Sequence, residues 1–195
     1  MIKGAFQDET ILRKREERKK EQHASLETGL YLNGTVVSFK REQVAKEVFV
    51  MIPETFEVMP MELARIKYPS VFRPHHLLTN EQLTVNMGFS VFPDHLEEME
   101  IQSVGEQVKQ TLQSSQDVCD FGEVAVLRKV QGCCFHFRQH VPDGDLYQVM
   151  GMIRMGQYLC QCTFHCAYPD HPDWEKMVPI MWESMEYEKK KGVRL

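Results

Sequence analysis

The sequence predicts an α+β fold in which an antiparallel β-sheet is flanked by helices. A strand at Leu83–Phe92 alternates apolar and polar residues, which is typical of a sheet with one buried face. Amphipathic stretches before and after the C-terminal strands supply helices that can cover such a sheet. The clearest evidence is a run of three consecutive strands in the last third of the chain, at Cys133–Val141, Tyr147–Met155 and Tyr158–Cys166.

Charge divides the chain into a short arm and one domain. Asp8–Glu27 carries twelve charges, six of each sign, and few of its side chains are apolar. We expect residues 1–28 to form a charged N-terminal arm, helical or frayed and solvated, with a partner-binding or dimerising helix as the alternative. Residues 29–195 then form a single domain that is large enough to bury a core.

Local patterns predict the elements in the first half of the domain. Runs of β-branched and aromatic residues indicate strands, and Pro60 suits the first turn of a helix. The expected strands are Thr35–Phe39, Glu47–Ile52 and Arg73–Thr79, and the expected helix is Met61–Lys67.

Two longer helices are expected, one before and one after the C-terminal strands in the sequence. The first is Asp94–Leu112, with Asp94 as its N-cap and an apolar stripe that can dock on the sheet. A further strand spans Val118–Leu127. The closing helix, Asp173–Tyr187, places Trp174 toward the sheet, and Pro179 is expected to kink it.

The C-terminal strands define two faces of the sheet. A two-residue turn at Gly156–Gln157 pairs Ile153 with Cys160, which brings their apolar neighbours onto one face. We assume a longer or bulged loop at Asp143–Gly144, which adds the odd positions of Cys133–Phe137 to this face. This cysteine layer contains Cys133, Phe135, Phe137, Val149, Gly151, Ile153, Cys160, Cys162, Phe164 and Cys166. The opposite, polar face carries Cys134, His136, Arg138, His140, Met150, Met152, Arg154, Gln161, Thr163 and His165.

The polar face is the candidate binding site. Two arginines and three histidines on adjacent strands can receive an acidic peptide or another anion, and the histidines add positive charge below about pH 6.5. The alternative is a face that is solvated or covered by the Asp94–Leu112 helix. The candidate binding residues are His136, Arg138, His140, Arg154 and His165.

The six cysteines offer the only alternative chemistry. Cys134 beside His136 is the one cysteine placed for a thiol nucleophile. Cys160, Cys162 and Cys166 form the candidate metal cluster. However, Cys162 and Cys166 lie roughly 13 Å apart on a straight strand, too far for a shared zinc shell. We therefore expect buried free thiols and no metal site.

The composition narrows the classes of function. The 195 residues are 43% hydrophobic and 26% charged, with a formal net charge of −5, so no electrostatic feature favours nucleic acid or an anionic membrane as partner. No stretch reaches the ~20 consecutive apolar residues of a membrane helix, and the N-terminal residues lack the apolar core of a secretion signal. The cytoplasm is therefore the expected location.

No catalytic or cofactor motif is present, such as a glycine-rich phosphate loop or a GxSxG elbow. We therefore expect a non-enzymatic binding, adaptor or chaperone-like module, with another protein as its partner and no cofactor. The alternative is a metal-dependent or thiol enzyme that uses Cys134 and His136, or the cluster of Cys160, Cys162 and Cys166.

One pattern runs through most of the domain, at Lys67–Pro69, Arg73–Pro74, Thr79–Asn80, Asn86–Ser90, Asp143–Tyr147, Gly156–Leu159, Thr163–Cys166, Trp174, Ile180 and Ser184. This pattern resembles the PsbP/DcrB/Mog-type superfamily over roughly Gly29–Tyr187. The resemblance implies an α/β/α sandwich that acts as a binding or assembly module, with no catalytic residue. Roles in the superfamily include photosystem assembly, small-GTPase binding and chaperoning of secreted effectors.

Overall fold

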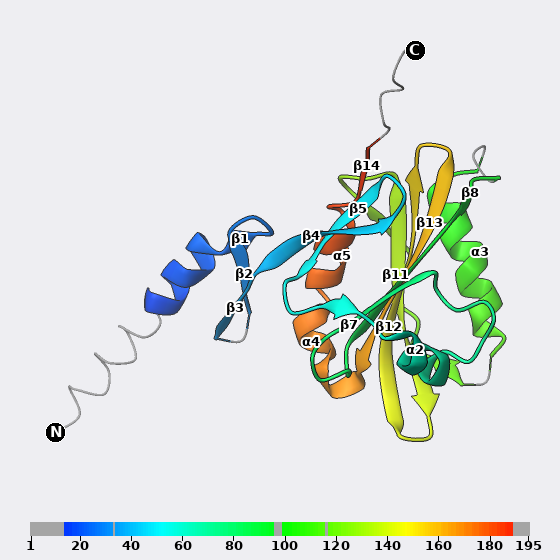
Figure 1. The fold of residues 1–195 in the computed structure, drawn as a ribbon, viewed down its shortest axis with the longest axis horizontal. Helices are drawn as coiled ribbons and strands as arrows, with labels where there is room; N and C mark the ends of the chain where they lie inside the picture. Colours follow the sequence, from blue (N-terminus) through cyan, green and yellow to red (C-terminus); the bar gives the residue numbers. More distant parts are fainter. Residues whose placement is uncertain (1–13, 33, 96–98, 116, 189–195) are drawn as a thin grey trace, which may run out of the picture.

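The computed structural model describes residues 14–32, 34–95, 99–115 and 117–188. At its centre is a sheet of antiparallel strands in the order β10-β11-β12-β13-β8-β7-β6, with β9 paired to β11 (Figure 1). The three C-terminal strands are neighbours, as predicted. The strands are β6 Glu57–Val58, β7 His76–Thr79, β8 Asn86–Pro93, β9 Val118–Cys119, β10 Ala125–Leu127, β11 Gly132–Val141, β12 Gly144–Met155 and β13 Tyr158–Ala167.

Both faces of the central sheet are covered, so the predicted α+β class with flanking helices is confirmed. One face packs against α3 (Ile101–Gln113). The other packs against α5 (Met177–Trp182) and against a small sheet in the order β14-β5-β4. The short helix α2 (Met61–Lys67) has the predicted bounds. The small sheet consists of β4 Phe39–Ala45, β5 Val48–Pro53 and β14 Glu186–Tyr187. Among the described helices, none is long and apolar enough to span a membrane.

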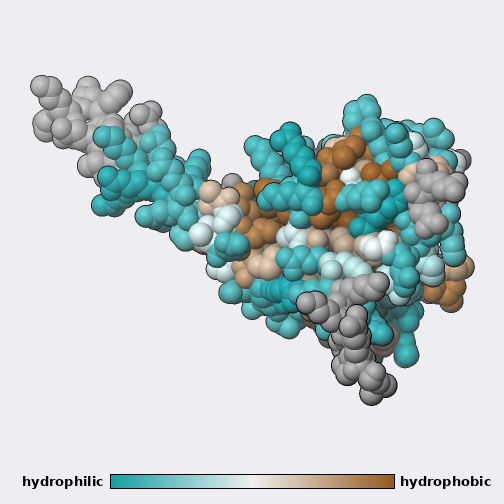
Figure 2. Space-filling model, turned by 90° about the horizontal axis from the view of Figure 1, so that it is seen from above, coloured by the Kyte–Doolittle hydropathy of each residue, from teal (hydrophilic) through white to brown (hydrophobic). Residues whose placement is uncertain are grey.

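The charged segment projects from the domain. Residues 14–22 are helical with exposed side chains, and β1 (Ala24–Ser25) then pairs with β2 (Gly29–Leu32), which pairs with β3 (Thr35–Val37). Figures 1 and 2 show this part extending to one side of the domain, and its helix has a hydrophilic surface. Leu30 on β2 joins the main hydrophobic core, so the sheet of β1, β2 and β3 is anchored there. The expected arm before residue 14 lies outside the described residues.

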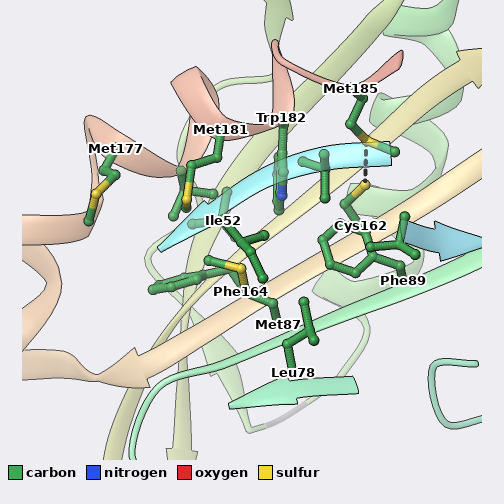
Figure 3. Packing of buried hydrophobic residues seen from close by; sticks show 14 of the residues in the cluster. Ile52, Leu78, Met87, Phe89, Cys162, Phe164, Met177, Met181, Trp182 and Met185 are labelled. Atoms are coloured by element: carbon green, nitrogen blue, oxygen red, sulfur yellow. Dashed lines mark hydrogen bonds between the residues drawn. The ribbon is translucent and has the colours of Figure 1, made fainter. Parts of the chain in front are cut away.

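The main core lies between β13 and α5. Figure 3 shows Met181 and Trp182 of α5 pointing toward Ile52 on β5 and Phe164 on β13. These four side chains are fully buried. Met185 packs beside them, with its sulfur 3.6 Å from the sulfur of Cys162. These apolar contacts hold α5 and the β14-β5-β4 sheet against the central sheet.

The closing helix differs from the prediction. In its place are two short helices, α4 (His171–Trp174) and α5, preceded by the 3₁₀ turn η1 (Tyr168–Asp170). Glu186 and Tyr187 form the strand β14 and do not continue the helix. The break lies at Glu175–Lys176 rather than at Pro179. Pro179 is the third residue of α5, where a backbone N–H has no partner within the helix, so its ring is tolerated.

The helix predicted from Asp94 also begins later. α3 starts at Ile101 with Glu100 as its N-cap, and residues 96–98 lie outside the described residues. Asp94 is buried, and its Oδ2 accepts a hydrogen bond from Arg154. The predicted strands Arg73–Thr79 and Leu83–Phe92 begin later, as β7 at His76 and β8 at Asn86. The predicted strand Thr35–Phe39 is divided between β3 and β4. Val118–Leu127 is divided into β9 and β10, which both pair with β11.

The faces of β11 are the main correction. The predicted pairing of β12 with β13 is confirmed, with Ile153 opposite Cys160. Between β11 and β12, however, a tight turn pairs Val141 with Gly144, so Pro142 and Asp143 are its two central residues. A one-residue change in a turn exchanges the two faces of a strand.

As a result, the odd positions of β11 lie under α3 and not in the cysteine layer. Cys133, Phe135 and Phe137 belong to the core cluster of α3. A Cβ at Gly105 of α3 would lie 2.6 Å from the sulfur of Cys133, so glycine permits this close packing.

Candidate functional site

The five predicted binding residues lie in three different places. His136, Arg138 and His140 are on the cysteine side of β11, because the tight turn exchanges its faces. His165 lies on the opposite side, the side of α3. Arg154 also lies on that side but is 7% exposed, and its Nε donates to Oδ2 of Asp94 at 2.7 Å. The prediction that the five share one polar face is therefore wrong.

Arg138 is held in a compact cluster at the end of β11. Its Nε donates to Oδ2 of Asp145 at 2.9 Å, and its guanidinium lies 4.4 Å from the ring centre of Tyr168. His140 Nδ1 lies 2.6 Å from Oδ1 of the same carboxylate. Hydrogen bonds from Arg138 first, and then from His140, lower the pKa of Asp145. The guanidinium is therefore already engaged by an acid of this chain.

His136 lies in a neighbouring hollow of about 140 Å³. Its ring centre is 5.7 Å from that of Tyr147, and a Cβ at Gly122 would overlap the ring. The imidazole thus fills the space that a glycine leaves open. The ring of His136 is therefore packed against its neighbours.

A pocket of about 390 Å³ lies over β13, and we call it the β13 pocket. Its floor comes from the sheet, where side chains of β8, β12 and β13 are polar. Its wall comes from the segment after α2. The lining residues are Lys67, Tyr68, Pro69, Ser70, Phe72, Arg73, Pro74, Ser90, Gln148, Gln161, Thr163 and His165.

The wall lies close to the sheet because Gly88 of β8, beneath Pro74, has no side chain. Gly88 is opposite Thr163 in the sheet. A Cβ at Gly88 would lie 2.5 Å from Cγ of Pro74 and 2.6 Å from Oγ1 of Thr163. Ser90, two residues on, accepts a hydrogen bond from the backbone N–H of His75. Small residues on β8 therefore seat the segment across the sheet.

His165 is a half-buried group at the edge of this pocket. Asn86 donates to its Nε2 at 3.0 Å, and the hydroxyl of Tyr68 lies 3.3 Å from the same nitrogen. Burial first, and then the charge of Lys67, lower the pKa of His165 to about 4. The prediction that this histidine gains charge below pH 6.5 is therefore wrong.

Two cations border the pocket, and neither was among the predicted binding residues. Lys67 donates from Nζ to the backbone carbonyl of Leu83. Arg73 contacts only the sulfur of Met61 among its hydrogen-bond partners in the described residues, at 3.9 Å. Within the described part of the chain, neither cation forms an ion pair, and no carboxylate lines the pocket. The pocket therefore has a positive rim in a protein of negative net charge.

Apolar side chains stand exposed beside these cations. Phe72, which also lines the pocket, is 92% exposed, and Val71 is 86% exposed. Ile66 on α2 is 77% exposed. Ile66 precedes the pocket residue Lys67 in the sequence, and Val71 lies between the pocket residues Ser70 and Phe72.

The cysteines named for enzyme chemistry are buried thiols. Burial raises the pKa of Cys134 to about 11 and that of Cys166 to about 12, so both stay protonated near neutral pH. The sulfurs of Cys160 and Cys162 are 3.8 Å apart, and all six cysteines are free. In the described residues, no group of three or more His, Cys, Asp and Glu is arranged to hold a metal ion.

Comparison with known proteins places the fold. No known protein family matches the sequence, and no curated protein is significantly similar to it. The structure is similar to cyanobacterial PsbP from Synechocystis sp. PCC 6803, with a TM-score of 0.54 and 12% identity over 82% of this chain and 98% of that one. The PsbP-type fold implied by the sequence resemblance is confirmed. At this identity the likeness concerns the fold alone.

Two further structures are similar. LpqN, described as involved in cell envelope biogenesis of Mycobacterium tuberculosis, has a TM-score of 0.52 and 8% identity over 82% of this chain and 95% of LpqN. The Saccharomyces cerevisiae Ran-binding protein Mog1p has a TM-score of 0.48 and 8% identity over 77% of this chain and 96% of Mog1p.

Proposed function

We propose that the protein is a non-enzymatic binding module of the cytoplasm that holds a segment of a partner protein in the β13 pocket. The observation that carries this proposal is the combination of a pocket of about 390 Å³ with two cations at its rim and no carboxylate in its described lining. Pockets of this size hold a side chain or a small ligand. Of the five residues predicted from the sequence, His165 is the one that lines it.

The charges and the apolar surface favour one kind of occupant. Lys67 and Arg73 favour a carboxylate, because hydrogen bonds between ionised groups are the strong ones. Phe72 and Val71 favour an apolar side chain next to that carboxylate. The amides and hydroxyls of the floor, at Gln161 and Thr163, can pair with a peptide backbone. The occupant is therefore a peptide segment with an acidic residue beside an apolar one.

A displayed library of random peptides tests this proposal. Selection on the full chain should enrich peptides with Asp or Glu beside an apolar residue. Arg73→Ala should weaken the binding of a selected peptide by about tenfold or more, because a hydrogen bond to a charged group contributes about 1.5–3 kcal/mol. Phe72→Ala should weaken binding as well, and isothermal titration measures both effects.

The chain offers matched controls for each variant. Arg65 and Lys67 both lie in the last turn of α2, but Arg65 does not line the pocket, so Arg65→Ala should leave the affinity unchanged where Lys67→Ala lowers it. Val126→Ala is the corresponding control for Phe72, because Val126 is an exposed apolar residue of β10 that does not line the pocket. If no peptide is enriched, or if selected peptides bind Arg73→Ala as tightly as the parent, the pocket is not the binding site.

A further inference from the structure

A thiol, an imidazole and a carboxylate lie in one row beside β11. Cys119 Sγ is 3.3 Å from Nε2 of His140, and Nδ1 of His140 is 2.6 Å from Oδ1 of Asp145. Arg138 donates to the other oxygen of that carboxylate at 2.9 Å. Strand pairing places the four residues together, because Cys119 is opposite Arg138 and His140 is opposite Asp145.

This row sets the tautomer of His140. The Asp145 carboxylate, held by Arg138, accepts the hydrogen bond of Nδ1–H, which leaves Nε2 as the acceptor that faces the thiol. A nucleophile within reach of a base, with the base oriented by a third group, is the arrangement that activates a thiol. Sequence patterns missed it because the three residues lie on three different strands, β9, β11 and β12.

The thiol can be reached from solvent. Cys119 is half-buried, whereas the other five cysteines are buried. The side chain of His140 is 53% exposed. Partial burial first, and then the neighbouring carboxylate of Asp120, raise the pKa of Cys119. The resting thiol therefore keeps its proton, and a base must take it when the sulfur reacts.

We propose that Cys119 is an oxidisable thiol that reacts with small neutral hydroperoxides, with His140 as the general base and Asp145 as a positioning residue. The sulfur of Cys119 attacks one oxygen of hydrogen peroxide. The S–O bond forms as the O–O bond breaks, and the thiol proton passes through Nε2 of His140 to the departing hydroxide, which leaves as water. Sulfur loses two electrons and becomes a sulfenic acid, and the peroxide is reduced.

The charges around the thiol select this class of oxidant. Asp120 and Asp145 raise the pKa of Cys119 by their negative charge, and Arg138, which pairs with both, lowers it. The three groups together leave one net negative charge beside the thiol. An anionic oxidant such as glutathione disulfide meets the same repulsion. Hydrogen peroxide is neutral and small, so it avoids that repulsion and fits a half-buried site.

Peroxide oxidation of the reduced full chain, with dimedone as the trap, tests the proposal. Mass spectrometry should find the label on Cys119, and Cys119→Ser should remove it. At pH 7 the second-order rate should exceed that of N-acetylcysteine by about tenfold or more, since general-base assistance supplies about 10²–10⁴ when complete. His140→Gln should lose about tenfold or more, while His95→Gln, an exposed histidine elsewhere, should react like the parent.

The positioning role of Asp145 has its own readout. Asp145→Asn should lower the rate, and Asp145→Glu should restore part of it at unchanged melting temperature. Glutathione disulfide, tested in parallel, should react with Cys119 more slowly than with N-acetylcysteine. The proposal would be overturned if the parent reacted at the rate of N-acetylcysteine, or if His140→Gln reacted at the rate of the parent. Neither result bears on protein binding at the β13 pocket.

Discussion

Arg154 and Asp94 form an ion pair that is withdrawn from water. Nε of Arg154 lies 2.7 Å from Oδ2 of Asp94, and the two side chains are 7% and 2% exposed. Arg154 belongs to β12, and Asp94 follows β8, two strands that β13 separates in the sheet. The pair therefore spans β13 and connects three strands at one end of the sheet.

Removing one member of this pair should be costly. Asp94→Ala leaves the buried guanidinium without this carboxylate, and Arg154→Ala leaves the buried carboxylate without this guanidinium. Each variant should lower the free energy of unfolding by about 3–5 kcal/mol. The double variant should cost less than the sum, because both changes remove the same interaction. Urea denaturation of the four proteins measures this coupling, and costs that add within about 0.5 kcal/mol would contradict it.

The two tryptophans should differ in their contribution to stability. Trp182 is fully buried, and its ring lies so close to Gly151 that a Cβ there would come within 2.7 Å. Trp174 is half-buried, with its ring edge-on to Phe56 at 5.9 Å. Trp182→Ala should cost about 3–5 kcal/mol. Trp174→Ala should cost less, and thermal unfolding that ranks Trp174→Ala as the more damaging change would contradict this account of the core.

The pairing of the three C-terminal strands could be predicted because each strand and turn leaves a local pattern, but the faces of β11 depended on one residue. The sequence Val141-Pro142-Asp143-Gly144 contains the deciding signal, since Pro at the second position and Gly at the fourth favour a type I turn. That turn pairs Val141 with Gly144, as the structure does. Without it, Arg138 and the two histidines of β11 are assigned to the wrong side.

Long-range contacts explain what local patterns could not predict. Asp94 has the sequence position of an N-cap, but its carboxylate pairs with Arg154, 60 residues later. Likewise, Tyr68 contacts His165, 97 residues away, and this contact helps to form the β13 pocket. A pattern within one element carries no information on such partners. The alternation of apolar and polar residues in β13 predicted the polar residues of the pocket floor, whereas no pattern within one element predicted the pocket wall.

Burial of His165 should make stability depend on pH in acid. The pKa of His165 is about 4 in the folded chain, against the usual 6.5 when unfolded. Between these values the unfolded chain takes up a proton that the folded chain does not, so stability falls as the pH drops from 6.5 to 4. The stabilisation that is lost is about 3 kcal/mol, and it is fully present above pH 6.5.

A variant that cannot titrate isolates this effect. His165→Gln should shrink the difference in unfolding free energy between pH 7 and pH 4.5 by about 2–3 kcal/mol. His95→Gln replaces an exposed histidine and should leave that difference as it is in the parent. Guanidinium titrations at the two pH values provide the measurement. An unchanged difference in His165→Gln would mean that the histidine is not kept neutral by the fold.

Gly88 should control the shape of the β13 pocket, because a Cβ there would lie 2.5 Å from Cγ of Pro74. Gly88→Ala must therefore move the wall of the pocket away from the sheet. Amide hydrogen exchange in residues 69–75 should become faster, and peptides selected on the parent should bind more weakly, with a stability cost of about 1–3 kcal/mol.

Gly105→Ala is the matched control for this change. Its Cβ would meet the sulfur of Cys133 at 2.6 Å under α3, so it strains the core in a similar way but leaves the pocket wall in place. It should lose stability to a similar extent and keep the full affinity for the selected peptides. If Gly88→Ala kept both the affinity and the slow exchange of residues 69–75, the packing of Pro74 on Gly88 would not be what shapes the pocket. If both glycine variants lost affinity alike, the loss would come from general destabilisation rather than from the pocket wall.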